Sequence, residues 1–182
     1  TKHRVFQLLD ASVLPDNKLI AIALSDALHL GMLSSTPHVA WALASGSWLG
    51  VGNDPVYVKT RCFETFPFPA DDTGFAPSSP LAGTIRARAE AIDAHRKQVL
   101  ASEAGQQAGL TLTGLYNVLD ALRAGRPLSA KEKLHHDTGL VGVLQSLHDE
   151  LDAAVLQAYG WPDLGPVPWA DEGARQAWTE AL

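Results

Sequence analysis

The sequence predicts an α+β protein, in which a small mixed α/β segment is followed by a mainly α-helical C-terminal region. Short apolar runs bounded by turn residues occur before residue 70 and are typical of strands. Small and polar residues at 70–78 are typical of a linker. From residue 79 onward, apolar residues recur at helical spacing behind capping residues. We therefore predict a domain at 1–69, a linker at 70–78 and a helical domain at 79–182.

The N-terminal segment begins with two predicted strands and a helix. Arg4 to Leu9 and Lys18 to Leu24 are short apolar runs, and turn residues separate them. Ser25-Asp26 offers an N-cap, because a short polar side chain there accepts hydrogen bonds from the first free N–H groups of a helix. We expect that helix to continue through Leu30.

A second helix, a loop and a third strand complete this segment. The helix is expected from near Ser35 to Gly46, with Pro37 in its first turn, where a missing N–H costs least. Glycine, asparagine and proline between residues 50 and 55 predict a loop. Val56 to Phe63 then alternates as a strand does, which places on one face Tyr57, Lys59, Arg61 and Phe63.

The C-terminal region carries repeated helix start signals. Ser79 with Pro80, Thr111, and the capping box from Ser129 to Glu132 each precede an apolar stripe of helical period. The longest stripe consists of Leu140, Leu144, Leu147, Leu151 and Val155. The tail from residue 161 to 182 combines tryptophans with prolines, and we expect it to be irregular.

Composition narrows the class of protein. The net charge of −6 argues against nucleic acid, but residues 1–70 carry five basic and five acidic side chains, so the acidic excess belongs to 71–182. No apolar run of about 18 residues could span a membrane. The single cysteine, Cys62, allows no internal disulfide, which suits a cytoplasmic protein. We interpret Cys62 as structural, since no general base is evident beside it.

Histidines and carboxylates cluster in the helical region. His135-His136-Asp137 is followed one helix later by His148 and Asp152, which lie four residues apart and share a helical face. Two histidines and a carboxylate are a ligand set for a divalent ion. A turn at 135–138 and a solvent-exposed face at 148–152 explain the same pattern without a metal, and we favour that interpretation.

Familiar catalytic motifs are absent from the sequence, which has no glycine-rich phosphate loop, nucleophile elbow or cysteine pair for zinc. One candidate site remains, namely the predicted strand face that carries Tyr57, Lys59 and Arg61. Basic and aromatic side chains interleaved in this way suit phosphates and bases. An ordinary edge strand, with Tyr57 and Phe63 in a core, also explains the pattern, and spacing alone favours that interpretation.

One ordered set of motifs resembles a known family. Leu33-Ser34-Ser35 is followed by His38 and Trp41, a glycine-rich loop, an aromatic strand and finally Phe66-Pro67-Phe68-Pro69. This order resembles the end of the target-recognition domain in N6-adenine DNA methyltransferases of the type IIG and IIL restriction–modification group. The helices that follow, up to Tyr159-Gly160-Trp161-Pro162, resemble the C-terminal helical region of the same proteins.

The resemblance implies the C-terminal part of a larger enzyme, with Thr1 as a cut point. In that family an upstream domain binds S-adenosylmethionine and carries an Asn-Pro-Pro-Tyr-type catalytic loop, and the target adenine is flipped out of the duplex. This sequence has no Asn-Pro-Pro run, and Asn53-Asp54-Pro55 lies in a different context. We therefore expect recognition of double-stranded DNA without catalysis, and no cofactor bound by these residues.

The sequence departs from the family after the paired serines. Relatives often have a basic residue there, whereas Thr36-Pro37 follows Ser35. Lys59 and Arg61 are then the candidates to supply the charge. Ser34 and Ser35 are candidates for capping the next helix and for a phosphate contact, since the free N–H groups of a helix N-terminus attract anions.

These inferences give one expected function and two alternatives. Residues 1–69 are expected to be the distal part of a recognition domain, and 79–182 a helical support that packs on it or on the upstream methyltransferase domain. The predicted DNA contacts are Lys18, Ser34, Ser35, Tyr57, Lys59 and Arg61, and the expected core aromatics are Trp41, Phe63, Phe66 and Phe68. The alternatives are a helical protein-interaction module and a metal-dependent hydrolase centred on His135, His136 and His148.

Overall fold

The computed structural model describes residues 3–17, 19–51, 54–70 and 73–182. It is 58% helical and has a two-stranded antiparallel sheet, which confirms the predicted mainly helical α+β fold. The elements are α1 (Ala27–Ser34), α2 (Thr36–Ser45), β1 (Ser47–Leu49), β2 (Asp54–Val56), α3 (Lys59–Cys62), α4 (Pro80–Ala101), α5 (Glu103–Gln107), α6 (Leu112–Arg123), α7 (Ala130–Thr138), α8 (Val141–Ala158), η2 (Pro162–Leu164) and α9 (Glu172–Glu180).

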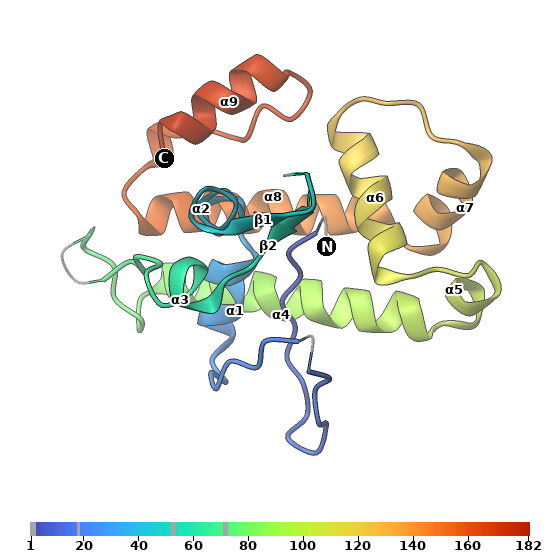
Figure 1. Ribbon diagram of the computed structural model, residues 1–182, viewed down its shortest axis with the longest axis horizontal. Helices are drawn as coiled ribbons and strands as arrows, with labels where there is room; N and C mark the ends of the chain where they lie inside the picture. The colour runs from blue at the N-terminus through green and yellow to red at the C-terminus, as the bar shows by residue number, and fades with distance from the viewer. Residues whose placement is uncertain (1–2, 18, 52–53, 71–72) are drawn as a thin grey trace.

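Two long helices, α4 and α8, pack side by side through the middle of the molecule (Figure 1). Helix α1 packs on α4, α2 lies against α8, and α5 to α7 gather at one end. Gly31 allows the close approach of α1, because a Cβ there would lie 2.6 Å from Cγ2 of Ile85. No helix of the described residues is long and apolar enough to cross a membrane.

Residues from both sides of the predicted linker contribute to one hydrophobic core. Leu28 and Met32 of α1 pack in the same cluster as Ile85 of α4 and Leu151 of α8. Phe75, within the predicted linker, is also buried there. Each large apolar side chain buried in this way contributes about 1.5–3 kcal/mol to folding, so the N-terminal segment is bound to the helical region by its core.

The predicted helix starts are confirmed. The N-cap side chains accept hydrogen bonds from backbone N–H groups of the first turn, and these residues are Asp26, Ser79, Thr111 and Ser129. The reciprocal capping box of Ser129 and Glu132 is complete. Such caps contribute about 1 kcal/mol each, which explains why the sequence locates these helices well.

The two predicted N-terminal strands are wrong. Residues 4–9 and 19–24 belong to no sheet, and Lys18 lies outside the described residues. The carbonyl oxygens of Phe6 and Leu8 accept hydrogen bonds from Arg96 (2.6 Å) and Lys97 (2.9 Å) of α4. Side-chain donors from a helix therefore take the place of a neighbouring strand.

The predicted strand from Val56 to Phe63 is also wrong. Strand β2 ends at Val56, and the helix α3 begins at Lys59. Cys62 is fully buried against α2, and its thiol donates to the carbonyl oxygen of Ala42 at 3.5 Å, so its structural role is confirmed. This packing contact outweighs the alternating pattern.

Three expectations for the helical region need correction. Residues 135–138 lie within α7 and form no turn, and the tail contains α9, whose Trp178 is buried. His148 and Asp152, expected on a solvent-exposed face, are only 6% and 5% exposed. The face of α8 opposite the leucines is covered, because α2 and α6 pack against this helix as well.

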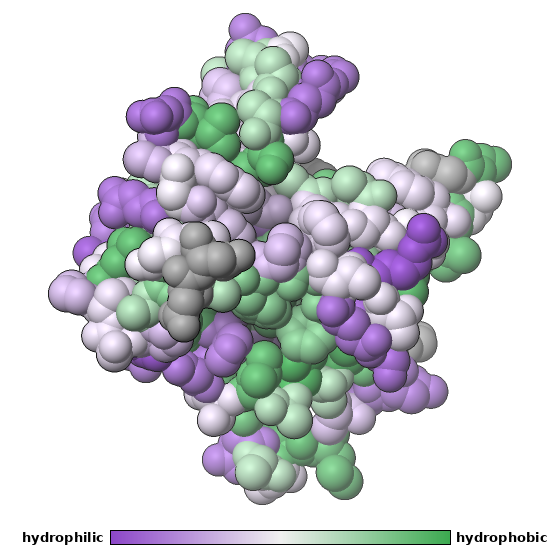
Figure 2. Space-filling model, turned by 90° about the vertical axis from the view of Figure 1, so that its left-hand side faces the viewer, coloured by the Kyte–Doolittle hydropathy of each residue, from purple (hydrophilic) through white to green (hydrophobic). Residues whose placement is uncertain are grey.

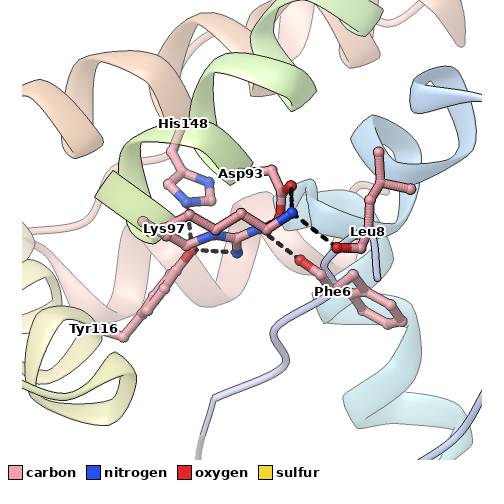
Figure 3. A network of polar contacts seen from close by, with 7 residues as sticks. Phe6, Leu8, Asp93, Lys97, Tyr116 and His148 are labelled. Atoms are coloured by element: carbon pink, nitrogen blue, oxygen red, sulfur yellow. Dashed lines mark hydrogen bonds and ion pairs between the residues drawn. The ribbon is translucent and has the colours of Figure 1, made fainter. Parts of the chain in front are cut away.

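A buried polar network joins the N-terminal segment to the helices (Figure 3). The Arg96 guanidinium donates to the hydroxyl of Tyr116 at 3.1 Å, and that hydroxyl lies 2.9 Å from Nε2 of His148. Arginine only donates, so Tyr116 gives its own proton to His148. Burial, followed by the charges of Arg123 and Arg96, lowers the pKa of His148 to about 3, and the imidazole is neutral at pH 7.

Candidate nucleic-acid interface

The predicted DNA-contacting residues do not form one surface. Lys59 and Arg61 are exposed, Ser34 and Tyr57 are half-buried, Ser35 is buried, and Lys18 lies outside the described residues. The shared face expected for Tyr57, Lys59 and Arg61 does not form, because α3 replaces the strand.

Tyr57 points into the protein. Its hydroxyl lies 3.1 Å from Nε2 of His38, and Nδ1 of that imidazole lies 2.8 Å from the carbonyl oxygen of Leu33. A carbonyl oxygen only accepts, so the proton of His38 is on Nδ1, and Nε2 accepts from Tyr57. Burial lowers the pKa of His38 to about 4, which keeps it neutral at pH 7. Tyr57 is therefore a structural residue here.

The N-terminus of α2 is occupied by a side chain of this protein. Ser35 does not cap the helix as predicted, because its hydroxyl donates to the carbonyl oxygen of Met32 at 2.6 Å. The carboxylate of Asp152 instead accepts from the backbone N–H of Thr36. The hydroxyl of Ser34 is buried and has no hydrogen-bond partner among the described residues. An anion site at this helix end is thus closed by Asp152.

Lys59 and Arg61 differ from the arginines of the helical region in their ion pairing. Five of those arginines pair with carboxylates, namely Arg86, Arg88, Arg96, Arg123 and Arg126. Within the described part of the chain, neither Lys59 nor Arg61 has an acidic group within ion-pair distance, although Asp54 and Glu64 are close in sequence. Their charges are free to attract an external anion.

A β-hairpin beside α3 presents apolar side chains that sequence reasoning missed. In the hairpin of β1 and β2, Trp48 is 50% exposed, Leu49 is 62% exposed and Val51 in the connecting turn is 95% exposed. The signal was present in the run from Trp48 to Val51, where large apolar residues flank Gly50, whose φ is +65°. A left-handed glycine is typical of a tight turn.

The hairpin and α3 are adjacent. Ser47 pairs with Val56 at the base of the hairpin, three residues before Lys59. A Cβ on Gly46 would lie 3.5 Å from the Cys62 sulfur, so the start of β1 and the end of α3 are in contact. Helix α3, which carries the exposed cations, therefore lies at the base of the hairpin, whereas Leu49 and Val51 lie toward its other end.

The predicted metal alternative has no geometric support. Among the residues that the structure describes, no group of three or more His, Cys, Asp or Glu side chains could hold a metal ion. Nε2 of His135 lies 3.1 Å from the carbonyl oxygen of Ala108, and His148 is bound to Tyr116. His136 pairs with its neighbour Asp137.

Comparison with protein-family models, with curated proteins and with solved structures found no significant match.

Proposed function

We propose that the chain binds double-stranded DNA as the distal recognition part of an N6-adenine DNA methyltransferase or a fused restriction–modification enzyme. The observation that carries this proposal is the pair of exposed cations Lys59 and Arg61, which have no ionic partner among the described residues. The ordered motifs from Leu33 to Pro69 point to the same class.

The geometry of α3 suits phosphate contacts. Residues two apart on a helix point in different directions, so Lys59 and Arg61 would contact separate phosphates. The buried Cys62 packs α3 against α2, so the helix that carries the two exposed cations is anchored to the fold. Contacts of this kind position a protein on the duplex and supply much of its affinity.

Catalysis in this proposal belongs to the upstream domain of the same protein. That domain would bind S-adenosylmethionine and provide the catalytic loop, while this chain supplies contacts to DNA. The buried His38 and His148 are not available as acids or bases for a substrate, because each is bound to a tyrosine hydroxyl.

The experiment is duplex binding by the chain with both cations removed. With random-sequence DNA duplexes, Lys59→Ala together with Arg61→Ala should weaken binding by about tenfold or more at moderate salt. The matched control is Lys131→Ala with Lys133→Ala on α7, which removes two exposed basic residues at the same spacing. Equal affinity of the two double variants would refute the proposal.

A second surface supports the proposed contact with the upstream methyltransferase domain. Leu14, Leu19 and Ile20 are 93%, 57% and 44% exposed. A groove of about 430 Å³ with mainly apolar walls is lined by residues from 3–9, 19–24, 29–33 and 55–57. Figure 2 shows hydrophobic surface on the lower part of the molecule, where Figure 1 places the projecting N-terminal loop.

Burial of this surface would require a protein partner, since exposed apolar patches of this kind mark interfaces. Co-expression of the upstream region with the chain should give a stable complex, and Leu19→Ser with Ile20→Ser should reduce its recovery. The control is Leu134→Ser with Val143→Ser, which changes two exposed apolar residues of the helical region. Equal recovery with both double variants would contradict this contact.

A further inference from the structure

The β-hairpin of β1 and β2 exposes three large apolar side chains close together in sequence. Trp48, Leu49 and Val51 are all at least half exposed. A short hairpin gains little stability from such side chains unless they pack against something. Their exposure therefore requires an explanation outside the fold of the described residues.

The position of the hairpin identifies the kind of partner. Its base lies at α3, which carries the unpaired cations Lys59 and Arg61. Cations at the base and apolar groups at the turn complement a surface that is anionic at its edge and apolar within. Nucleic acid has this arrangement, with phosphates outside and stacked bases inside, and proteins often insert apolar side chains between base steps.

We propose that the hairpin is an apolar wedge that contacts the stacked bases of DNA, with Trp48, Leu49 and Val51 as the contacting residues. This inference rests on the proposed function and adds a second type of contact to it. Lys59 and Arg61 contact the phosphate backbone of the DNA, and Trp48, Leu49 and Val51 enter the DNA groove. The aromatic face of Trp48 stacks on a base, and the aliphatic side chains separate neighbouring bases.

The charge of this region favours DNA over a protein partner. The hairpin contains one ionisable residue, Asp54, and the nearest cations in sequence lie on α3. Lys59 and Arg61 would remain unpaired against an apolar protein surface, at a cost in desolvation. DNA provides a counter-charge for the cations and an apolar stack for the hairpin at the same time.

The test uses a duplex that contains a fluorescent adenine analogue, whose emission rises when the base unstacks. Addition of the protein should raise the emission, and a duplex with an unpaired adenine should bind more tightly than a fully paired one, because unstacking there costs less. Leu49→Gln with Val51→Gln should abolish the emission rise. Trp48→Ala should weaken binding by about tenfold.

The control variant is Leu134→Gln with Val143→Gln, which should keep the emission rise. If the hairpin variants bind DNA with unchanged salt dependence and the emission still rises, the wedge is refuted while DNA binding stands. If the protein binds DNA and the emission never rises, the wedge is refuted in the same way. Absence of salt-dependent binding by the unmodified chain would refute both proposals.

Discussion

Asp152 on α8 accepts two hydrogen bonds from Thr36, the first residue of α2. The donors are the backbone N–H at 2.7 Å and the side-chain hydroxyl at 2.6 Å. A carboxylate distant in sequence therefore occupies the end of the helix where Ser35 was expected to act as the cap. The contact ties the N-terminal segment to the long central helix α8.

Asp152→Ala should destabilise the protein by about 1–3 kcal/mol, because the two Thr36 donors lose their buried acceptor. Urea unfolding checks this value. The control is Glu150→Ala on the same helix, since the side chains of Glu150 and of its partner Arg88 are 50% and 38% exposed. That variant should lower the free energy of unfolding by less than about 1 kcal/mol. Similar losses in both variants would contradict a specific role for Asp152.

Two buried histidines should make stability depend on pH. Burial lowers the pKa of His38 to about 4 and that of His148 to about 3, from 6.5. As the pH falls below about 6.5, the unfolded chain binds two protons that the folded chain does not, and the free energy of unfolding falls. Asp152 opposes this below about pH 6, because burial raises its pKa to about 6. Below about pH 6, the proton that folded Asp152 binds therefore offsets the effect of one of the two histidines on the free energy of unfolding.

Urea unfolding at a series of pH values checks this balance. The free energy of unfolding should be lower near pH 5 than near pH 7, and each histidine contributes up to about 1.4 kcal/mol per pH unit. His148→Gln should give a shallower dependence between those values, because one titrating group has been removed. If the free energy of unfolding of this variant keeps the same slope against pH, His148 is not a buried neutral imidazole.

Arg96 should hold the N-terminal segment in place. Its side chain is 4% exposed, pairs with Asp93, and donates to the carbonyl oxygen of Phe6. Arg96→Ala should destabilise the fold by about 1–3 kcal/mol, since the carbonyl oxygen of Phe6 and the hydroxyl of Tyr116 lose a buried donor, while Asp93 keeps its ion pair with Lys97. Hydrogen exchange of residues 4–9 should accelerate. Arg88→Ala on the same helix is the control, because its side chain is 38% exposed and pairs with Glu150 of α8, so a smaller effect is expected; equal effects would contradict this assignment.

Tyr57→Phe separates structural roles from DNA contact. The variant leaves Nε2 of the buried His38 without its donor, which should lower stability by about 1–2 kcal/mol. Duplex affinity should stay unchanged under conditions where the protein is folded. Urea unfolding and a DNA titration of the same sample give both values. A loss of duplex affinity without a loss of stability would indicate that Tyr57 contacts DNA.

The elements that the sequence predicted well are those with local causes. The N-caps Asp26, Ser79 and Thr111 and the capping box of Ser129 each act within one helical turn, so their residues are sufficient to place them. The helical period of the apolar residues likewise identifies the buried faces of α4 and α8. Leu140 is the exception in the predicted stripe, because it precedes α8 and is 54% exposed.

The errors have distant causes. The alternation from Val56 to Phe63 is overruled by the packing of Cys62 on Ala42, 20 residues away. The burial of Asp152 depends on Thr36, and the N-terminal segment is held by Arg96. Of the candidate site, Lys59 and Arg61 were predicted and are exposed, whereas the hairpin was missed because a short apolar run does not reveal which residues remain uncovered.

The salt dependence of duplex binding measures whether Lys59 and Arg61 contact phosphates. The logarithm of the affinity should fall linearly with the logarithm of the salt concentration between about 50 and 200 mM. Removal of both Lys59 and Arg61 should reduce the magnitude of that slope by about 1.8, the value for two lost phosphate contacts. The control without Lys131 and Lys133 should keep the full slope. An unchanged slope in the first variant, or a salt-independent affinity of the unmodified chain, would refute DNA binding through Lys59 and Arg61.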